Sequence, residues 1–430
     1  MINNEFYDIL QKGLGRAFNY VSTHKKEELR PDLLDACLHN LVYDSQSEKS
    51  RSDWLFKLIS LTDDVEFYRQ EIVNALPNTV EFWDKEQLYN LVAIWAKQGC
   101  KEAKQIIYDS FRKQEFDESW LGGAAIIEID GICGLLYVAD IVGRRLIKDE
   151  ELWEDDYLIS IAGESFGVEK VMKALEQESK NNSNIKYYLN TVKKHKYNIE
   201  NNNKARRSKR QIWDIDTVLQ QIEKPKTHIY GFVKFGRYAQ PEDIERAFDN
   251  LLKETRREQL IRYLWIFKDR QFPKLDNKLF DFATANDKEL QTAAIRGLAN
   301  HQDKSIHDLA IHLIRKNINL IDIRVFKLLI NNYITGNYKL IEPFLLISQD
   351  IHFRHDIGMD LIKIIDTQKT SELQNCALWV YENTPCAYCR QKIVEILIDL
   401  KLAPKSLLEE CLNDCSSDIR ELASKNNLVK

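Results

Sequence analysis

The sequence predicts an all-α protein, and three observations carry that prediction. Glycine and proline are scarce, at 15 and 8 of 430 residues, whereas sheet proteins use both in their many tight turns. Apolar residues recur at helical spacing through most of the chain. Hydrophobic residues make up 44% and charged residues 30%, a composition typical of folded, soluble proteins and not of disordered ones.

Residues 1–180 are predicted to be an acidic helical domain of irregular spacing. They hold 34 acidic and 21 basic side chains, a balance of −13. Pro31 suits the first turn of a helix, and Gly99 suits a helix end. The apolar spacing predicts helices at about 4–21, 31–43, 52–61, 65–76, 82–98, 101–114, 119–130, 132–147 and 168–178, and 157–162 fits either a helix or a short strand.

The C-terminal part is predicted to consist of paired helices. Residues 288–300 place apolar side chains on one helical face, and residues 306–314 do so again after a short polar turn. Two such helices pack antiparallel because only then do both apolar stripes become buried. Further helices are expected at about 322–334, 338–348, 354–366, 371–382, 386–400, 405–413 and 417–426.

The residue pattern within these helix pairs indicates a repeat architecture. Small residues occur inside the helices, with an Asp at the turn and an Arg early in a second helix, as in Ser417-Asp-Ile-Arg-Glu-Leu-Ala423 and in 303–310. Over residues 240–430 the pattern resembles HEAT repeats. The resemblance implies an α-solenoid of stacked antiparallel helix pairs, in which each pair buries its stripe against its neighbours. It implies an architecture and leaves the activity open.

A basic linker is predicted at 181–212, between the acidic domain (1–180) and the HEAT-like domain (213–430). Residues 193–210 contain eight Lys or Arg and one acid, and three Asn stand in a row at 201–203, which is typical of a flexible connector. The run could instead neutralise nucleic-acid phosphates, with neighbouring aromatic side chains stacking on bases. It could also bind an acidic surface, such as that of the chain's own N-terminal part.

The basic residues also support a nucleic-acid alternative farther along the chain. Some DNA glycosylases are built from HEAT-like repeats and use basic residues, a Trp and an Asp in their clefts. Trp265 and Asp269 lie one helical turn apart, close to three arginines. The candidate nucleic-acid-binding residues are Lys204, Arg206, Arg207, Lys209, Arg210, Arg256, Arg257 and Arg262.

Four cysteines near the C-terminus define a candidate metal site. If 386–400 and 405–413 pair antiparallel, Cys386, Cys389, Cys411 and Cys415 lie at similar height, and four thiolates suit a tetrahedral zinc. Burial as small apolar residues is the favoured interpretation, since the cysteines continue apolar stripes. A redox pair at a helix start is a third alternative. No cofactor is expected, and His352 and His355 are interpreted as surface or loop residues.

Residues 121–167 hold the candidate catalytic groups. Five glycines lie in 121–143 together with Glu128, Asp130 and Asp140. Carboxyls in apolar surroundings have raised pKa values and can act as acid, base or metal ligand, but close packing of a helix pair is the favoured interpretation. Ser165 lies in a Gly-x-Ser-x-Gly match, which as a nucleophile elbow needs a strand before it and a helix after it. Asp269 is the remaining weak catalytic candidate.

An acidic run at 149–156 places six acids in eight residues around Trp153. It lacks the Gly and the alternating ligands of a calcium loop. We interpret it as exposed surface. The alternative is a binding site for cations or for a basic partner.

The leading functional hypothesis is a non-enzymatic scaffold that binds another macromolecule, a protein partner above all. The alternatives are a nucleic-acid-binding solenoid and an enzyme that uses the groups in 121–167. Neither a secretory signal nor an apolar run of membrane-spanning length is visible. Together with eight cysteines interpreted as free thiols, this predicts cytoplasmic residence and no membrane. The oligomeric state stays open.

Overall fold

The computed structural model describes residues 4–113, 119–149, 151–209, 213–225, 227–316, 323–346 and 350–427. Regular secondary structure in these ranges is helical throughout, without a strand, which confirms the all-α prediction. No helix in them has both the length and the apolar character needed to cross a membrane. The chain divides into two compact units: Met1–Lys209 with Glu410–Arg420, and Arg210–Glu409 with Glu421–Lys430.

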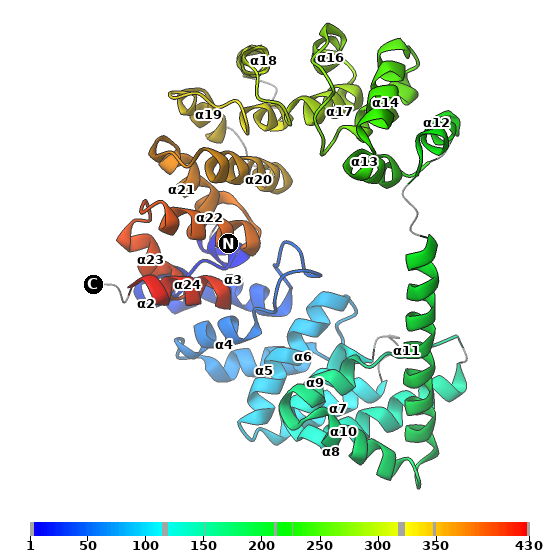
Figure 1. Cartoon of the computed structure of the whole chain (residues 1–430). Coiled ribbons are helices and arrows are strands. Elements are labelled where there is room, and N and C mark those ends of the chain that lie inside the picture. Colours follow the sequence, from blue (N-terminus) through cyan, green and yellow to red (C-terminus); the bar gives the residue numbers. More distant parts are fainter. Residues whose placement is uncertain are drawn as a thin grey trace. The chain divides into compact units, whose positions relative to one another are not determined.

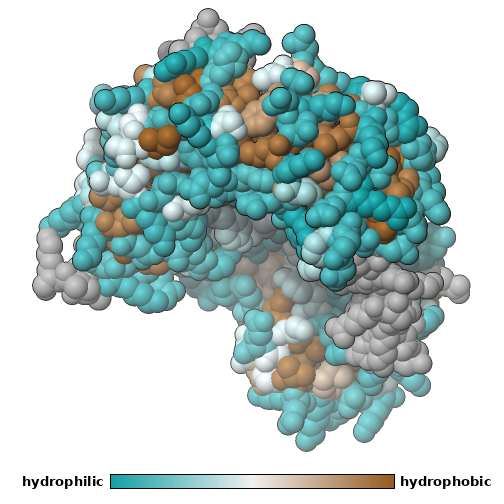
Figure 2. Space-filling model, turned by 45° about the horizontal axis from the view of Figure 1, so that its top comes forward, coloured by the Kyte–Doolittle hydropathy of each residue, from teal (hydrophilic) through white to brown (hydrophobic). Residues whose placement is uncertain are grey.

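The first unit contains the helices drawn in blue to green in Figure 1. They are α1 (Asn4–Lys12), α2 (Ala17–Thr23), α3 (Lys26–Leu38), α4 (Ser52–Ser60), α5 (Val65–Ala75), α6 (Phe82–Lys97), α7 (Lys101–Lys113), α8 (Trp120–Lys148), α9 (Tyr157–Phe166), α10 (Val168–Glu178) and α11 (Ser183–Lys209). Figure 2 draws one face of the whole molecule, on which hydrophobic residues lie in separate patches among hydrophilic ones.

Two helix boundaries near the N-terminus differ from the prediction. The helix expected at 4–21 is divided, because Gly13 adopts a φ of +73°, a left-handed conformation that suits glycine. Pro31 lies inside α3 and not in its first turn, so that prediction is wrong. Burial of Leu29 and Leu33 on one face of α3 outweighs the hydrogen bond that proline cannot donate. Gly99, with a φ of +96°, ends α6 as predicted.

The glycine-rich helix α8 is broken at Gly131, where φ is +59°, between the two predicted helices. A Cβ on Gly134 would lie 2.4 Å from the carbonyl oxygen of Ile126, and one on Gly143 would lie 2.0 Å from that of Asn184. Only glycine permits these approaches, since real Cβ contacts are longer. The predicted role of these glycines in close helix packing is therefore confirmed.

The segment predicted as a basic linker is helical from Ser183 to Lys209. Its first part packs on α8 with four buried side chains, Ile185, Tyr188, Leu189 and Val192. These residues have the i, i+3, i+4, i+7 spacing of an amphipathic helix. That spacing is present in the sequence, where the charge run and the three asparagines that follow it favour a linker instead.

The first unit is discontinuous in sequence, because residues 410–420 pack on its N-terminal helices. The Cys415 N–H donates to the Gly13 carbonyl at 2.9 Å, and Trp54 Nε1 donates to the Asn413 carbonyl at 2.9 Å. A Cβ on Gly15 would lie 2.0 Å from the Glu410 carbonyl oxygen. The sequence did not predict this arrangement, since helical periodicity is a local signal.

The second unit is a succession of helices, drawn in green to red in Figure 1, in which neighbours along the chain pack on one another. They are α12 (Ile215–Glu223), α13 (Ile229–Tyr238), α14 (Pro241–Lys253), α15 (Arg257–Ile266), α16 (Asn277–Ala283), α17 (Lys288–Leu298), α18 (Lys304–Lys316), the 3₁₀ helix η1 (Ile323–Leu329), α19 (Tyr338–Leu345), α20 (Ile351–Gln368), the 3₁₀ helix η2 (Ser371–Leu373), α21 (Gln374–Asn383) and α22 (Ala387–Asp399). Helices α23 (Lys405–Cys411) and α24 (Ser417–Asn427) are the last two.

Polar side chains connect successive layers of the second unit. Asn300 Nδ2 donates to the Phe267 carbonyl at 2.9 Å, and Asn331 Nδ2 donates to the Ala299 carbonyl at 2.8 Å. Gln368 Nε2 likewise donates to a carbonyl about one helix pair earlier, that of Ile330, at 2.7 Å. These bonds satisfy carbonyls at helix ends, which have no partner within their own helix.

Candidate functional site

An open pocket in the first unit brings together four separate segments of the chain. These are the loop before α4, the start of α6, the start of α8 and the loop that leads into α9. The pocket has a volume of about 690 Å³, within the range of ligand sites. Its lining residues are Ser45, Gln46, Glu48, Lys49, Ser50, Trp83, Glu86, Ser119, Trp120, Glu151, Leu152, Trp153, Glu154, Asp155 and Tyr157.

Aromatic rings form the apolar part of this pocket. Phe82 packs edge-on against both Trp83 and Trp120, with ring centres 5.0 and 5.2 Å apart. Tyr157 packs edge-on against Trp120. Trp153 is 63% exposed and Tyr157 is 51% exposed, so their rings are accessible to a ligand. The faces of such rings attract cations.

The polar part of the pocket lining is predominantly acidic. Among the described lining residues Lys49 is the basic one, and its Nζ lies 3.0 Å from Asp418. Glu48 forms an ion pair with Arg51 at 3.3 Å. The other acids form no ion pair within the described part of the chain; they are Glu86, Glu151, Glu154 and Asp155. The pocket therefore carries an excess of negative charge.

Two of the acids without an ion pair are shielded from water, Glu154 more completely than the half-buried Glu86. Glu154 is 6% exposed, and Ser119 Oγ donates a hydrogen bond to its Oε1 at 2.6 Å. Burial, aided by the neighbouring Asp155 charge, raises the pKa of Glu154 to about 7 despite that bond. Burial also raises the pKa of Glu86 to about 6. A cation entering the pocket would stabilise the ionised form of both groups.

The acidic loop is held in place by the first part of α11. Trp153 stacks on His195 with ring centres 4.7 Å apart, and Lys196 Nζ lies 3.1 Å from Asp156 Oδ2. A further ion pair joins Lys193 of the same helix to Glu176, which lies on α10 and not in the acidic loop, at 3.5 Å. The basic run thus contacts the chain's own acidic N-terminal part, one of the alternatives open from the sequence.

The acids in the glycine-rich stretch are paired at the helix surface. Glu128 lies 2.9 Å from Lys97. Although burial raises the pKa of Asp130, hydrogen bonds from Lys104 and Tyr108 outweigh it and lower that pKa. Asp140 accepts from Asn182 and Asn184 at 2.9 Å, and these bonds with Arg144 lower its pKa against burial. The raised pKa values that the catalytic alternative requires are therefore not present at either aspartate.

Ser165 lies inside α9 and is exposed. Residues 157–162, which fitted either a helix or a strand, belong to the same helix. A nucleophile elbow needs a strand that ends in a sharp turn at the serine. Ser165 has no such setting.

The predicted nucleic-acid-binding arginines of the second unit are engaged within it. Arg256 lies 2.7 Å from Glu223 and from Glu254. Arg257 pairs with Asp287 and Glu289. Arg262 Nη1 donates to the Ile222 and Lys224 carbonyls at 2.5 and 2.6 Å. The backbone of Lys204, Arg206, Arg207 and Lys209 lies in α11, whereas Arg210 lies outside the described residues.

Trp265 and Asp269, the other residues of the nucleic-acid alternative, also contact arginines of the second unit itself. The Arg296 guanidinium lies 4.8 Å from the Trp265 ring centre. Asp269 accepts from Arg237 Nε at 2.9 Å and forms an ion pair with the same guanidinium. Asp269 is therefore engaged in an exposed ion pair with Arg237.

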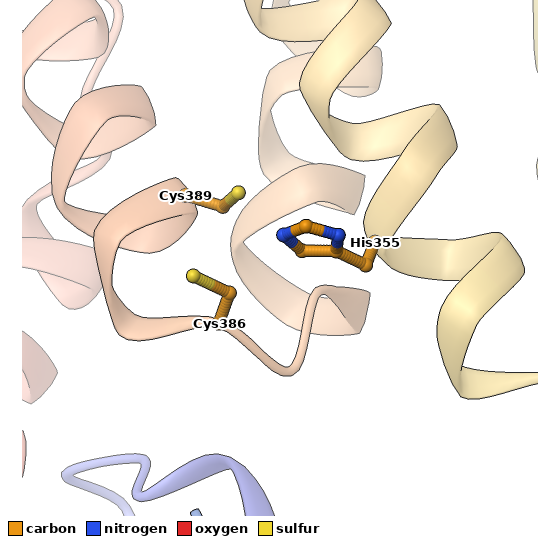
Figure 3. A group of neighbouring side chains, drawn as sticks. All are labelled: His355, Cys386 and Cys389. Atoms are coloured by element: carbon orange, nitrogen blue, oxygen red, sulfur yellow. The ribbon is translucent and has the colours of Figure 1, made fainter. Parts of the chain in front are cut away.

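The cysteines predicted as one cluster do not all belong to one group. Cys386 and Cys389 come together with His355, which lies on α20, and the donor atoms of the three lie within 4.8 Å of one another (Figure 3). Cys411 and Cys415 are not members of this cluster and lie in the segment that packs in the first unit. Hydrogen bonding from Cys389, and then from His355, lowers the pKa of Cys386 against the effect of burial.

Comparison of the chain with protein-family models, with curated proteins and with solved structures finds no match. The functional assignment therefore depends on the geometry of the chain itself.

Proposed function

We propose that this chain is a non-enzymatic binding protein that takes a lysine or arginine side chain of a protein partner into the aromatic and acidic pocket of its first unit. The observation that carries the proposal is the pocket itself, which combines accessible aromatic rings with carboxyls, one of them buried, in one opening of about 690 Å³. That volume exceeds what one side chain fills, so residues flanking the cation have room.

The chemistry of the lining selects for a cation. A guanidinium or ammonium over an aromatic face gains about 0.5–2 kcal/mol, more as water is excluded. A hydrogen bond to a charged carboxylate contributes about 1.5–3 kcal/mol. The carboxyls of Glu86 and Glu154 are disfavoured as anions by burial, and an incoming positive charge relieves that cost. An anionic ligand such as a phosphate backbone would be repelled.

We further propose that the second unit is a HEAT-like α-solenoid that acts as a scaffold. The packing of each helix on its neighbours along the chain and the recurring side-chain bonds to carbonyls of the preceding pair support this. In such an array each repeat is stabilised by the next. The internal ion pairs of Arg256 and Arg257 favour a protein partner over nucleic acid.

The proposal is tested with the full-length chain and a fluorescent peptide of alternating arginine and glycine. Its control replaces each arginine with citrulline, which has the same shape and no charge. We expect the charged peptide alone to raise the anisotropy signal, and Trp153→Ala to weaken its binding about tenfold, or about 1.4 kcal/mol. Trp153 is exposed, so this variant leaves the core intact, while it also removes the stack on His195.

A matched variant, Glu164→Gln, removes an exposed acid from α9 that does not line the pocket, and should bind as the original does. Equal binding of the citrulline peptide would refute recognition by charge. Unchanged binding by Trp153→Ala would refute the pocket. Tighter, salt-sensitive binding of a DNA or RNA oligonucleotide would favour the nucleic-acid alternative.

A further inference from the structure

The start of α22 places two sulfurs on one side of the helix. Thr384 is extended, with φ −77° and ψ 134°, as the residue before a proline tends to be. Cys386 follows Pro385 as the N-cap of α22, and Cys389 lies in the first turn. N-cap and N3 side chains approach each other at a helix start. The Cys-x-x-Cys spacing thus gives a preformed pair of donors.

A third donor arrives from another helix because glycine permits a close approach. Gly358 is one turn after His355 on α20, and a Cβ on it would lie 2.2 Å from Thr384 Cγ2. The absent side chain lets α20 approach the residues that lead into α22. In Figure 3 the imidazole edge remote from α20 faces both sulfurs.

The spacing of the three donors suits a transition-metal ion. Their atoms all lie within 4.8 Å of one another. Zinc bonds of about 2.3 Å to sulfur and about 2.0 Å to nitrogen require tetrahedral donor separations of roughly 3.4–3.8 Å. Small side-chain rotations bring the cluster to that spacing. Two thiolates and an imidazole form a donor set that zinc prefers over the oxygen-seeking magnesium or calcium.

Burial and charge favour the same ion. Cys386 and Cys389 are each 7% exposed, and the His355 side chain is 18% exposed. Two thiolates in such surroundings are costly without a counter-charge, whereas two thiolates with one divalent ion are neutral. The Asp356 carboxylate lies 3.9 Å from His355 Nδ1, which is too long for a hydrogen bond but places a further negative charge beside the site.

We propose that His355, Cys386 and Cys389 bind one Zn²⁺ ion with three protein ligands, leaving a fourth position to water or to an incoming ligand. The site is independent of the cation pocket, since it lies in the second unit. Binding releases the thiol protons and joins α20 to α22. A site with an open fourth position differs from the closed four-cysteine site considered from the sequence.

Two other interpretations make different predictions for the same residues. A disulfide would use the two sulfurs and leave the imidazole without a role. If the cysteines were packed only as small apolar residues, the imidazole of His355 would not need to face both sulfurs, as it does in Figure 3. The convergence of three donors from two helices favours the metal.

The test uses the full-length chain, purified without metal-affinity steps, stripped with a chelator and then titrated with Zn²⁺ alone. We expect one zinc per chain by elemental analysis, and on Co²⁺ substitution the intense visible absorption of a tetrahedral site with a thiolate charge-transfer band. Zn²⁺ should also protect Cys386 and Cys389 from alkylation, as read by mass spectrometry. These readouts use the unaltered protein, so they do not depend on the folding of a variant.

Matched variants then locate the ion. His355→Gln and Cys389→Ser should lose stoichiometric zinc, whereas Cys133→Ser, which removes an exposed cysteine of α8, should keep it. Retention of the far-ultraviolet circular dichroism spectrum separates loss of metal from loss of fold. Zinc below about 0.2 per chain in the reconstituted protein, zinc retained by both ligand variants, or a Cys386–Cys389 disulfide that forms equally well with Zn²⁺ present would each overturn the proposal.

Discussion

Replacement of Glu154 by glutamine should stabilise the first unit at high pH and have little effect at low pH. The carboxyl is 6% exposed, and burial raises its pKa from 4.5 to about 7. Because the folded state then holds a proton that the unfolded state has released, stability falls as pH rises from about 4.5 to about 7. At about 1.4 kcal/mol for each pH unit between the two pKa values, the loss at pH 8 is roughly 3 kcal/mol.

Glutamine is neutral at every pH and keeps the oxygen that accepts from Ser119. Thermal unfolding of the full-length chain should therefore show Glu154→Gln with a Tm higher by roughly 6–12 °C at pH 8. At pH 5 the expected gain is below about 1 kcal/mol. The same variant should bind the arginine peptide less well, since it lacks the carboxylate.

The matched control is Glu151→Gln, which removes an acid from the same loop at an exposed position. It should change the Tm equally little at both pH values. If Glu154→Gln shifts the Tm by the same amount at pH 5 and pH 8, or lowers it at pH 8, the explanation by burial of a titrating carboxyl is refuted.

Two further predictions concern packing. Lys327 pairs with Asp360, which is 1% exposed. Lys327→Met should therefore lower the free energy of unfolding in urea at pH 8 by about 3 kcal/mol, because it leaves a buried charge without its partner. The double variant with Asp360→Asn should regain most of that stability, and a double variant no more stable than Lys327→Met would contradict this. Gly15→Val would place a side chain on the Glu410 carbonyl. This variant should make residues 410–420 more susceptible to limited proteolysis. Unchanged protection of that segment would show that the contact is dispensable.

The candidate pocket could be predicted only in part. The acidic run around Trp153 is visible in the sequence, where exposed surface is the favoured interpretation and binding of cations or of a basic partner is the alternative. Trp83, Glu86 and Trp120 were not predicted, because nothing in their local spacing connects them to residues 151–157. The interpretation of His355 as a surface or loop residue misses the cluster for the same reason, since its neighbours there are about thirty residues away along the chain.

Local signals in the sequence determined the helices. Spacing of apolar residues, scarce Gly and Pro, and the glycines at 99 and 131 specify helix positions and ends, because each depends on residues within one or two turns. Where local signals conflict, packing determines whether a segment is helical. Burial of one face of α3 keeps that helix continuous past Pro31, and an apolar stripe that packs on α8 makes the basic segment helical.

Only the tertiary structure decided which distant residues meet. It places 410–420 on the N-terminal helices, Glu154 next to Ser119 and His355 next to the Cys-x-x-Cys. Such contacts depend on the close approach of whole helices, as at Gly15 and Gly358, and periodicity along one helix does not encode its partner. The sequence by itself therefore determined the helices, and the packing of those helices determined the sites.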